Sequence, residues 1–184
     1  MILGWLGFCS GLFFQDFSID LNISITHFGF AIGLQLFLWG LFGPVFGIIT
    51  DKYGGKIAIF IGFLFYLSGC YLLYAGYNEG FWFTLCVGIL IGVGLGSTAI
   101  SIPVAIVAKH FPLSNRTMAT GIVTSAGSFG YFLSPLLTRY SLIEIGWEST
   151  VLIFIYLLFI GLITAFFITT PKTPVGSTPV ENNQ

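Results

Sequence analysis

Long stretches without a charged side chain set the tightest limit on how this chain can fold. Residues 28–49 and 57–73 contain no Asp, Glu, Lys or Arg. A helix that crosses the hydrocarbon core of a bilayer needs about 20 predominantly apolar residues. Charged residues make up only 7% of the chain, whereas a soluble domain carries about a quarter. The sequence therefore predicts an all-α integral membrane protein whose partner is the lipid bilayer.

Six apolar segments predict a single bundle domain over residues 1–170, and the first segment is short for a full span. It lacks a basic start and a small-residue cleavage site, so we expect no signal peptide and interpret it as the later part of a helix whose start is missing. Residues 171–184 lack apolar runs and predict a disordered cytoplasmic tail. The predicted helices span about residues 1–17, 28–50, 57–77, 81–108, 117–139 and 150–170.

The basic residues predict which ends of these helices face the cytoplasm. Five of the six fall in alternate connections or in the tail, and only Arg139 falls on the other side. Cytoplasmic loops carry an excess of Lys and Arg. We therefore expect the loops at 51–56 and 109–116 and the C-terminus to lie in the cytoplasm, with the chain in the plasma (inner) membrane. The five sorted residues are Lys52, Lys56, Lys109, Arg116 and Lys172.

Charge and cysteine content argue against several other functions. The net charge is −1 and no basic patch occurs, so nucleic acid is not an expected partner. Cys9, Cys70 and Cys86 lie in apolar runs without metal-ligand spacing, and their odd number predicts core thiols rather than a disulfide framework. We expect no metal and no cofactor. The sequence shows no nucleophile–base pair and no phosphate loop, so we do not expect an enzyme.

A charged, glycine-containing turn separates the second and third predicted helices. Gly54 and Gly55 permit backbone angles that let the chain reverse within few residues. A basic turn between any two membrane helices would explain part of this pattern. The turn also resembles the loop signature of the major facilitator superfamily, in which Asp51 would have a structural and gating role rather than bind substrate. The matching residues are Gly47, Asp51, Lys52, Gly54 and Lys56, and Gly55 replaces a usual basic residue.

A second resemblance covers the loop between the fourth and fifth predicted helices, the fifth helix and the start of the sixth. Residues 111–121 read Phe-Pro-x-x-x-Arg-x-x-Ala-Thr-Gly, with the arginine at Arg116, and Gly146-Trp147 follows later. This pattern is similar to the monocarboxylate-porter and oxalate–formate-exchanger branch. The resemblance implies the amino-terminal half of a twelve-helix carrier, with a three-plus-three inverted repeat and alternating access. It also implies a small organic anion as substrate, a carboxylate, although the arginine that typically holds it belongs to the second half.

Three groups of polar side chains inside the predicted helices are candidates for a substrate path. Within each group the spacing of three or four residues places the side chains on one helix face. The groups are Gln35 and Trp39, Ser97 and Ser101, and Thr124, Ser128 and Tyr131.

Each group also has a purely structural explanation. An amide at membrane depth is costly without a partner, so Gln35 either bonds another helix or contacts substrate. Hydroxyls can bond back to carbonyls of their own helix, or they can line a polar path. If these groups form one wall, an isolated half would expose it to lipid, and we expect a second six-helix half or another copy of the chain to cover it. A non-transporting membrane scaffold or remnant stays open as an alternative.

One further motif predicts packing rather than transport. Gly88, Gly92 and Gly96 lie four residues apart on the fourth predicted helix. Small residues at this spacing form a smooth groove along one face, which lets another helix approach closely. We therefore expect this face to contact a neighbouring helix.

Overall fold

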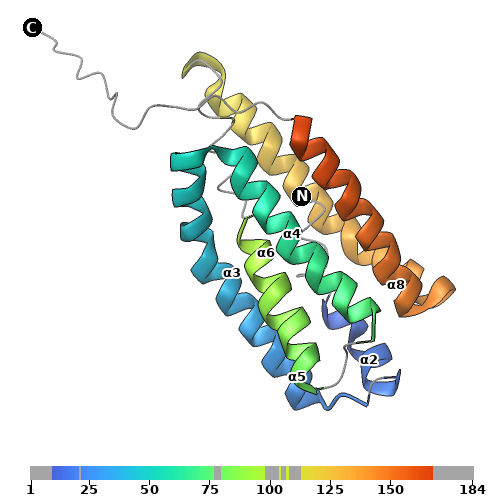
Figure 1. The fold of residues 1–184 in the computed structure, drawn as a ribbon. Helices are drawn as coiled ribbons and strands as arrows, with labels where there is room; N and C mark the ends of the chain where they lie inside the picture. Colours follow the sequence, from blue (N-terminus) through green and yellow to red (C-terminus); the bar gives the residue numbers. More distant parts are fainter. Residues whose placement is uncertain are drawn as a thin grey trace, which may run out of the picture.

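The computed structural model describes residues 10–20, 22–76, 80–97, 104, 107 and 113–167, and all its long elements are helices that lie side by side (Figure 1). Several predicted features lie outside these residues: the start of the first helix, Ser101, the loop at 109–112 and the tail. The elements are η1 (Ser10–Phe13), α2 (Phe14–Asp20), α3 (Ile25–Tyr53), α4 (Gly55–Tyr74), α5 (Gly80–Phe83), η2 (Thr84–Leu90), α6 (Ile91–Gly96) and α8 (Leu113–Phe167).

The junction between α3 and α4 is shorter than the loop expected at 51–56. Helix α3 continues through Tyr53, and only Gly54 separates it from α4. Gly54 has φ 92° and ψ 152°, a conformation that side chains disfavour. Its N–H still donates to the Thr50 carbonyl at 3.0 Å. A single glycine thus reverses the chain, and Asp51 and Lys52 belong to the last turn of a helix.

Helix α8 is a hairpin rather than one straight rod. Within α8, Gly146 alone departs from helical angles, with φ 76° and ψ 172°. Figure 1 shows α8 folding back on itself. We call residues 113–145 the first arm and residues 147–167 the second arm. The stretch between the helices predicted at 117–139 and 150–170 is therefore mostly helical, because one glycine supplies the whole reversal. The Thr150 hydroxyl donates to the Gly146 carbonyl at 2.7 Å, within the first turn of the second arm.

By length and composition, the described part holds three helices that can cross a membrane. They are Ile25–Tyr53, Gly55–Tyr74 and Ser114–Thr164, and the shorter apolar helix Gly80–Gly96 lies beside them. The third contains the hairpin, and each of its arms is at least as long as the roughly 20 residues that a single span requires. The fold is all-helical as predicted, while the count of six spans stays a prediction.

Glycines bring α5, η2 and α6, which follow one another without a break, close to their neighbours. A Cβ on Gly88 would lie 3.2 Å from the Ala31 carbonyl oxygen, and one on Gly92 would lie 2.9 Å from the Gln35 carbonyl oxygen. A Cβ on Gly96 would also contact α3, at 2.8 Å from the Phe42 Cβ. The predicted helix contact through these three glycines is confirmed, and its partner is α3.

An aromatic cluster fastens α2 to the rest of the bundle. The ring of Phe17 is buried and stacks on Phe13 at 5.4 Å between ring centres. It also meets the edges of Phe83 at 5.6 Å and of Trp147 at 5.3 Å. Burial of such side chains contributes about 1.5–3 kcal/mol each in water, but between lipid-exposed helices the gain comes from close packing. The cluster therefore joins α2, α5 and the second arm of α8.

Candidate functional site

The first arm of α8 carries the polar stripe that the sequence singled out. Thr124 and Ser128 are exposed and Tyr131 is half-buried. The Thr124 hydroxyl donates to the Thr120 carbonyl at 2.9 Å, and the Ser128 hydroxyl donates to the Thr124 carbonyl at 3.2 Å. Such back-bonds satisfy each hydroxyl proton within its own helix while the oxygen can still accept. The stripe is thus stable without a second helix, yet it still offers acceptors to a solute.

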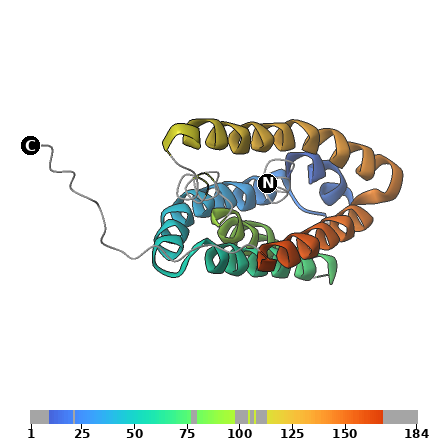
Figure 2. The same ribbon diagram turned by 90° about the horizontal axis from the view of Figure 1, so that it is seen from above.

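The stripe borders a buried face on the same arm. Gly127, Ser134 and Thr138 are buried, and they lie at helical spacing. Figure 2 shows the first arm along one edge of the bundle, with α4 along the opposite edge. The first arm therefore has one side turned to this bundle and another, with Thr124 and Ser128, that the described residues leave uncovered.

Ser97 does not share this surface. Its side chain is 0% exposed, and its hydroxyl donates to the Gly94 carbonyl at 2.8 Å. A Cβ placed on Gly62 of α4 would overlap the Ser97 side chain. Ser97 therefore fills the contact between α6 and α4. The structure does not bring it together with the stripe on α8, and Ser101 lies outside the described residues.

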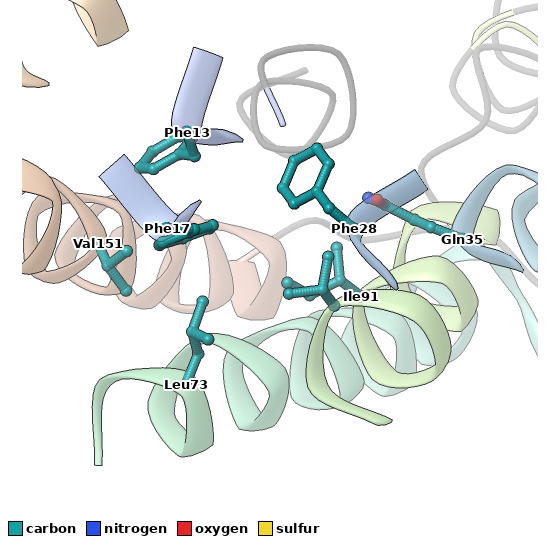
Figure 3. A pocket seen from close by; sticks show the side chains of 8 residues that line it. Phe13, Phe17, Phe28, Gln35, Leu73, Ile91 and Val151 are labelled. Carbon is teal, nitrogen blue, oxygen red and sulfur yellow. The ribbon is translucent and has the colours of Figure 1, made fainter. Parts of the chain in front are cut away.

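Gln35 lies inside the bundle rather than on an open wall. Its side chain is 1% exposed, and its Oε1 has no hydrogen-bond partner in the part of the chain that the structure describes. The residue lines a small cavity of about 20 Å³ (Figure 3). The other lining residues are Phe13, Phe17, Phe28, Leu73, Val87, Ile91 and Val151.

The expectation that an isolated half would expose Gln35 is therefore wrong. Opposite faces of α3 are both apolar enough to contact lipid. The spacing of residues in the sequence therefore does not predict which face packs inside the bundle. The exposed face instead carries Gly29, Gly33 and Gly40, and a Cβ on any of these would meet nothing within 4 Å in the described part. Trp39, one turn beyond Gln35, is half-buried and packs against the core.

The signature residues lie at the end of the bundle where α3 meets α4. Asp51 and Lys52 are exposed and Lys56 is half-buried. No described atom lies within 4 Å of a Cβ on Gly47, so no described helix packs closely against this position. Arg116 is exposed in the first turn of α8, and its carbonyl accepts the Thr120 hydroxyl at 2.9 Å.

One polar contact was missed by the sequence reading. The indole Nε1–H of Trp147 donates to the Asp20 carboxylate at 2.7 Å. Asp20 lies between the helices predicted at 1–17 and 28–50, and the sequence marks Trp147 only as part of a Gly-Trp pair. A tryptophan directly after the reversing Gly146 was the available signal, because a buried indole N–H usually has a partner.

Together these features define a membrane-embedded helical bundle with a polar helix face and no catalytic constellation among its described residues. The family model of the Major Facilitator Superfamily matches residues 1–183. The chain therefore belongs to this superfamily of secondary transporters, whose members are not enzymes.

Curated relatives support the same assignment. The chain is 26% identical to the probable nitrate transporter NarT of Staphylococcus carnosus over 89% of its own length and 41% of that protein. It is 27% identical to the hexuronate transporter of Bacillus subtilis, covering 83% of this chain and 34% of that one. With human monocarboxylate transporter 6 it shares 25% identity over 81% of this chain and 29% of the relative. The chain thus spans less than half the length of these relatives.

Proposed function

We propose that this chain transports a small organic solute, a carboxylate, by alternating access, as the amino-terminal half or a fragment of a secondary transporter. The observation that carries the proposal is the polar stripe on the first arm of α8, where Thr124 and Ser128 are exposed and Tyr131 is half-buried. The three relatives are named for nitrate, hexuronate and a monocarboxylate. All three solutes are anions at neutral pH, which supports an anionic substrate for this chain.

The transporting unit in this proposal has six spans over residues 1–170 and a disordered tail over 171–184. The two arms of α8 form the fifth and sixth spans, and the segment from Gly80 onward belongs to the fourth. The end that holds Asp51 and Lys52 faces the cytoplasm of the plasma (inner) membrane, because basic residues mark the cytoplasmic side. Asp51 is a gating residue there, working with Lys52, Lys56 and Arg116, and does not bind substrate.

Sidedness can be tested with two single cysteines in a background without native cysteines. Tyr53 and Ala75 are exposed residues near opposite ends of α4. An impermeant thiol reagent added outside intact cells should label Tyr53→Cys only after permeabilisation, and Ala75→Cys without it. Labelling of Tyr53→Cys in intact cells would reverse the proposed orientation.

A second half is the partner that this proposal requires. The relatives are more than twice as long as the aligned part, so the rest of their length supplies a comparable unit. The stripe on α8 and the exposed glycine face of α3 are two surfaces that such a unit, or another copy of this chain, can cover. A non-transporting membrane remnant or scaffold that pairs with another transporter half is the alternative.

The deciding experiment compares uptake and thiol access in reconstituted vesicles. Cysteines at Thr124, Ser128 and Tyr131 test the stripe, and Ser97→Cys is the buried control. When the chain is co-reconstituted with a matching second half, uptake of a labelled monocarboxylate is expected. The three stripe cysteines should then react with small hydrophilic thiol reagents and be protected by that solute, while Ser97→Cys stays inert.

The outcomes separate the alternatives. Uniform inertness at all three stripe positions, with no uptake, would leave the scaffold as the better account. Robust uptake by vesicles that hold only monomers, counted by photobleaching, would contradict the half-transporter proposal. Uptake of nitrate in place of monocarboxylate would keep the mechanism and correct the substrate.

A further inference from the structure

The short helix α2 is held between two irregular points in the backbone. The tighter 3-10 turn η1 precedes it, and Asn22, with φ 51°, follows it. A 3-10 turn is frequent at the start of an α-helix, whereas a positive φ is uncommon outside glycine and marks a turn of the chain. Figure 1 shows α2 at the end of the bundle where the α8 hairpin turns, away from the junction of α3 and α4. In the described part, α2 is therefore a short helix with a tighter turn before it and a change of chain direction after it.

A side-chain hydrogen bond ties this segment to another element far away in the sequence. It runs from the Trp147 Nε1–H to the Asp20 carboxylate at 2.7 Å, across 127 positions of sequence. Trp147 is 8% exposed, whereas Asp20 is exposed. The donor is thus fixed in the core and the acceptor lies at the surface, where water can compete for it.

The local structure around this bond favours a link that can open. Asp20 ends α2, and a carboxylate at a helix C-terminus is disfavoured by the helix dipole. The bond to Trp147 offsets this cost as long as it is formed. On the other side, the reversal at Gly146 aims the indole at Asp20, and the Thr150 hydroxyl fixes that turn through the Gly146 carbonyl.

We propose that Asp20 and Trp147 form a latch that holds α2 against the second arm of α8, and that the latch opens during the transport cycle. The claim that the latch opens during transport rests on the proposed function, whereas the claim that the latch exists does not. When the bond breaks, α2 swings about η1 and Asn22, and the ring of Phe17 leaves the edge of Trp147. The pair acts by positioning α2 and does not contact substrate.

The latch is tested by measuring distances between spin labels on the purified chain in nanodiscs. Labels at Ile19, which is 72% exposed, and at the exposed Tyr156 report α2 against the second arm. The parent should give one narrow distance distribution. Trp147→Phe keeps a ring but removes the donor, and Asp20→Ala removes the acceptor. Each should raise the ratio of released to latched molecules about tenfold, as loss of a hydrogen bond to a charged group implies.

Three comparisons separate a latch from general loosening. Asp20→Asn keeps an acceptor oxygen and should stay close to the parent. The double variant Asp20→Ala with Trp147→Phe should match either single variant, because both remove the same bond. Trp82→Phe, at an exposed tryptophan of α5, should change nothing. Additive effects in the double variant, or a parent-like Trp147→Phe, would overturn the latch.

Uptake by the chain with a second half then tests the role in transport. Latch variants should change the maximal rate several-fold and leave the half-saturation concentration unchanged. Parent-like rates in variants whose distances have shifted would show that α2 does not move in the cycle. If the parent itself fails to transport, the proposed function is wrong, while the distance distributions still decide whether the latch exists.

Discussion

Glycines serve opposite purposes in the two halves of the described bundle. On α6, a Cβ at Gly94 would lie 2.8 Å from the backbone nitrogen of Tyr66 and 2.9 Å from the Gly62 carbonyl oxygen of α4. On the first arm of α8, a Cβ at Gly121 or Gly130 would meet nothing within 4 Å among the described residues. The first set lets backbones touch, while the second leaves a surface uncovered. A glycine-rich helix is therefore not by itself evidence of close packing.

The hydroxyls repeat the same contrast. Ser97 and Thr124 both donate to a carbonyl of their own helix, at 2.8 and 2.9 Å. Ser97 is buried against α4, whereas Thr124 is exposed. Intrahelical bonding thus does not distinguish a structural hydroxyl from one available to a solute, and the position of the helix in the bundle does. The contact between α4 and α6 is a packed scaffold, whereas the first arm presents hydroxyls on a surface that the described residues leave uncovered.

The largest effect should come from adding one methyl group to the scaffold. Gly94→Ala forces the new Cβ against the backbone of α4, which cannot rotate away as a side chain can. We expect a loss of about 3 kcal/mol of unfolding free energy, the upper end of the cost of overpacking. Gly130→Ala is the matched control on the first arm and should be neutral. Unfolding in detergent, followed by near-ultraviolet circular dichroism, measures both, and equal losses would abolish the contrast between the two regions.

The amino-acid sequence anticipated much of the scaffold. Uncharged runs predicted α3 and α4 to within a few residues, and the spacing of Gly88, Gly92 and Gly96 predicted their helix contact. The start of α3 was placed late because Thr26 and His27 are polar, while the Ser24 side chain caps the helix by accepting the His27 N–H at 3.3 Å. Propensity and length carry this information locally, so sequence alone could supply it.

The candidate site was harder to predict because it depends on which helix face turns inward. Because both faces of α3 are apolar, the sequence pattern fits Gln35 equally well in a substrate path or in the protein core. The contact of Asp20 with Trp147 joins segments that lie 127 positions apart in the sequence. No local pattern encodes such a contact, and the spacing of Thr124, Ser128 and Tyr131 predicted a shared face without fixing what lies opposite.

A smaller effect, of opposite sign, is expected where the scaffold carries an unpartnered amide. Gln35→Leu removes the buried Oε1 and keeps a side chain of similar size in the same cavity. An unsatisfied buried polar atom costs about 1–3 kcal/mol, so this variant should raise the unfolding free energy by about 1 kcal/mol. The same detergent unfolding assay measures it, with Leu36→Ile on the exposed face of α3 as a control. A loss of stability would mean that Oε1 has a partner, such as an internal water, and that Gln35 belongs to a polar network.

The smallest change in stability should come from the uncovered hydroxyls of the first arm. Thr124→Val keeps the shape of the side chain and removes one back-bonded hydroxyl, and Ser128→Ala does the same for a serine. Because neither group is buried, each variant should stay within about 0.5 kcal/mol of the parent. Ser97→Ala, which removes a buried hydroxyl between α6 and α4, should cost about 1 kcal/mol of unfolding free energy.

The uptake rate should show the reverse order. Thr124→Val and Ser128→Ala should lower the rate if the stripe lines the path. Ser97→Ala should lower it only as far as it lowers the amount of folded protein. Losses of stability at Thr124 and Ser128 equal to that at Ser97, with unchanged uptake per folded molecule, would assign the stripe to packing and remove the functional contrast between the two regions.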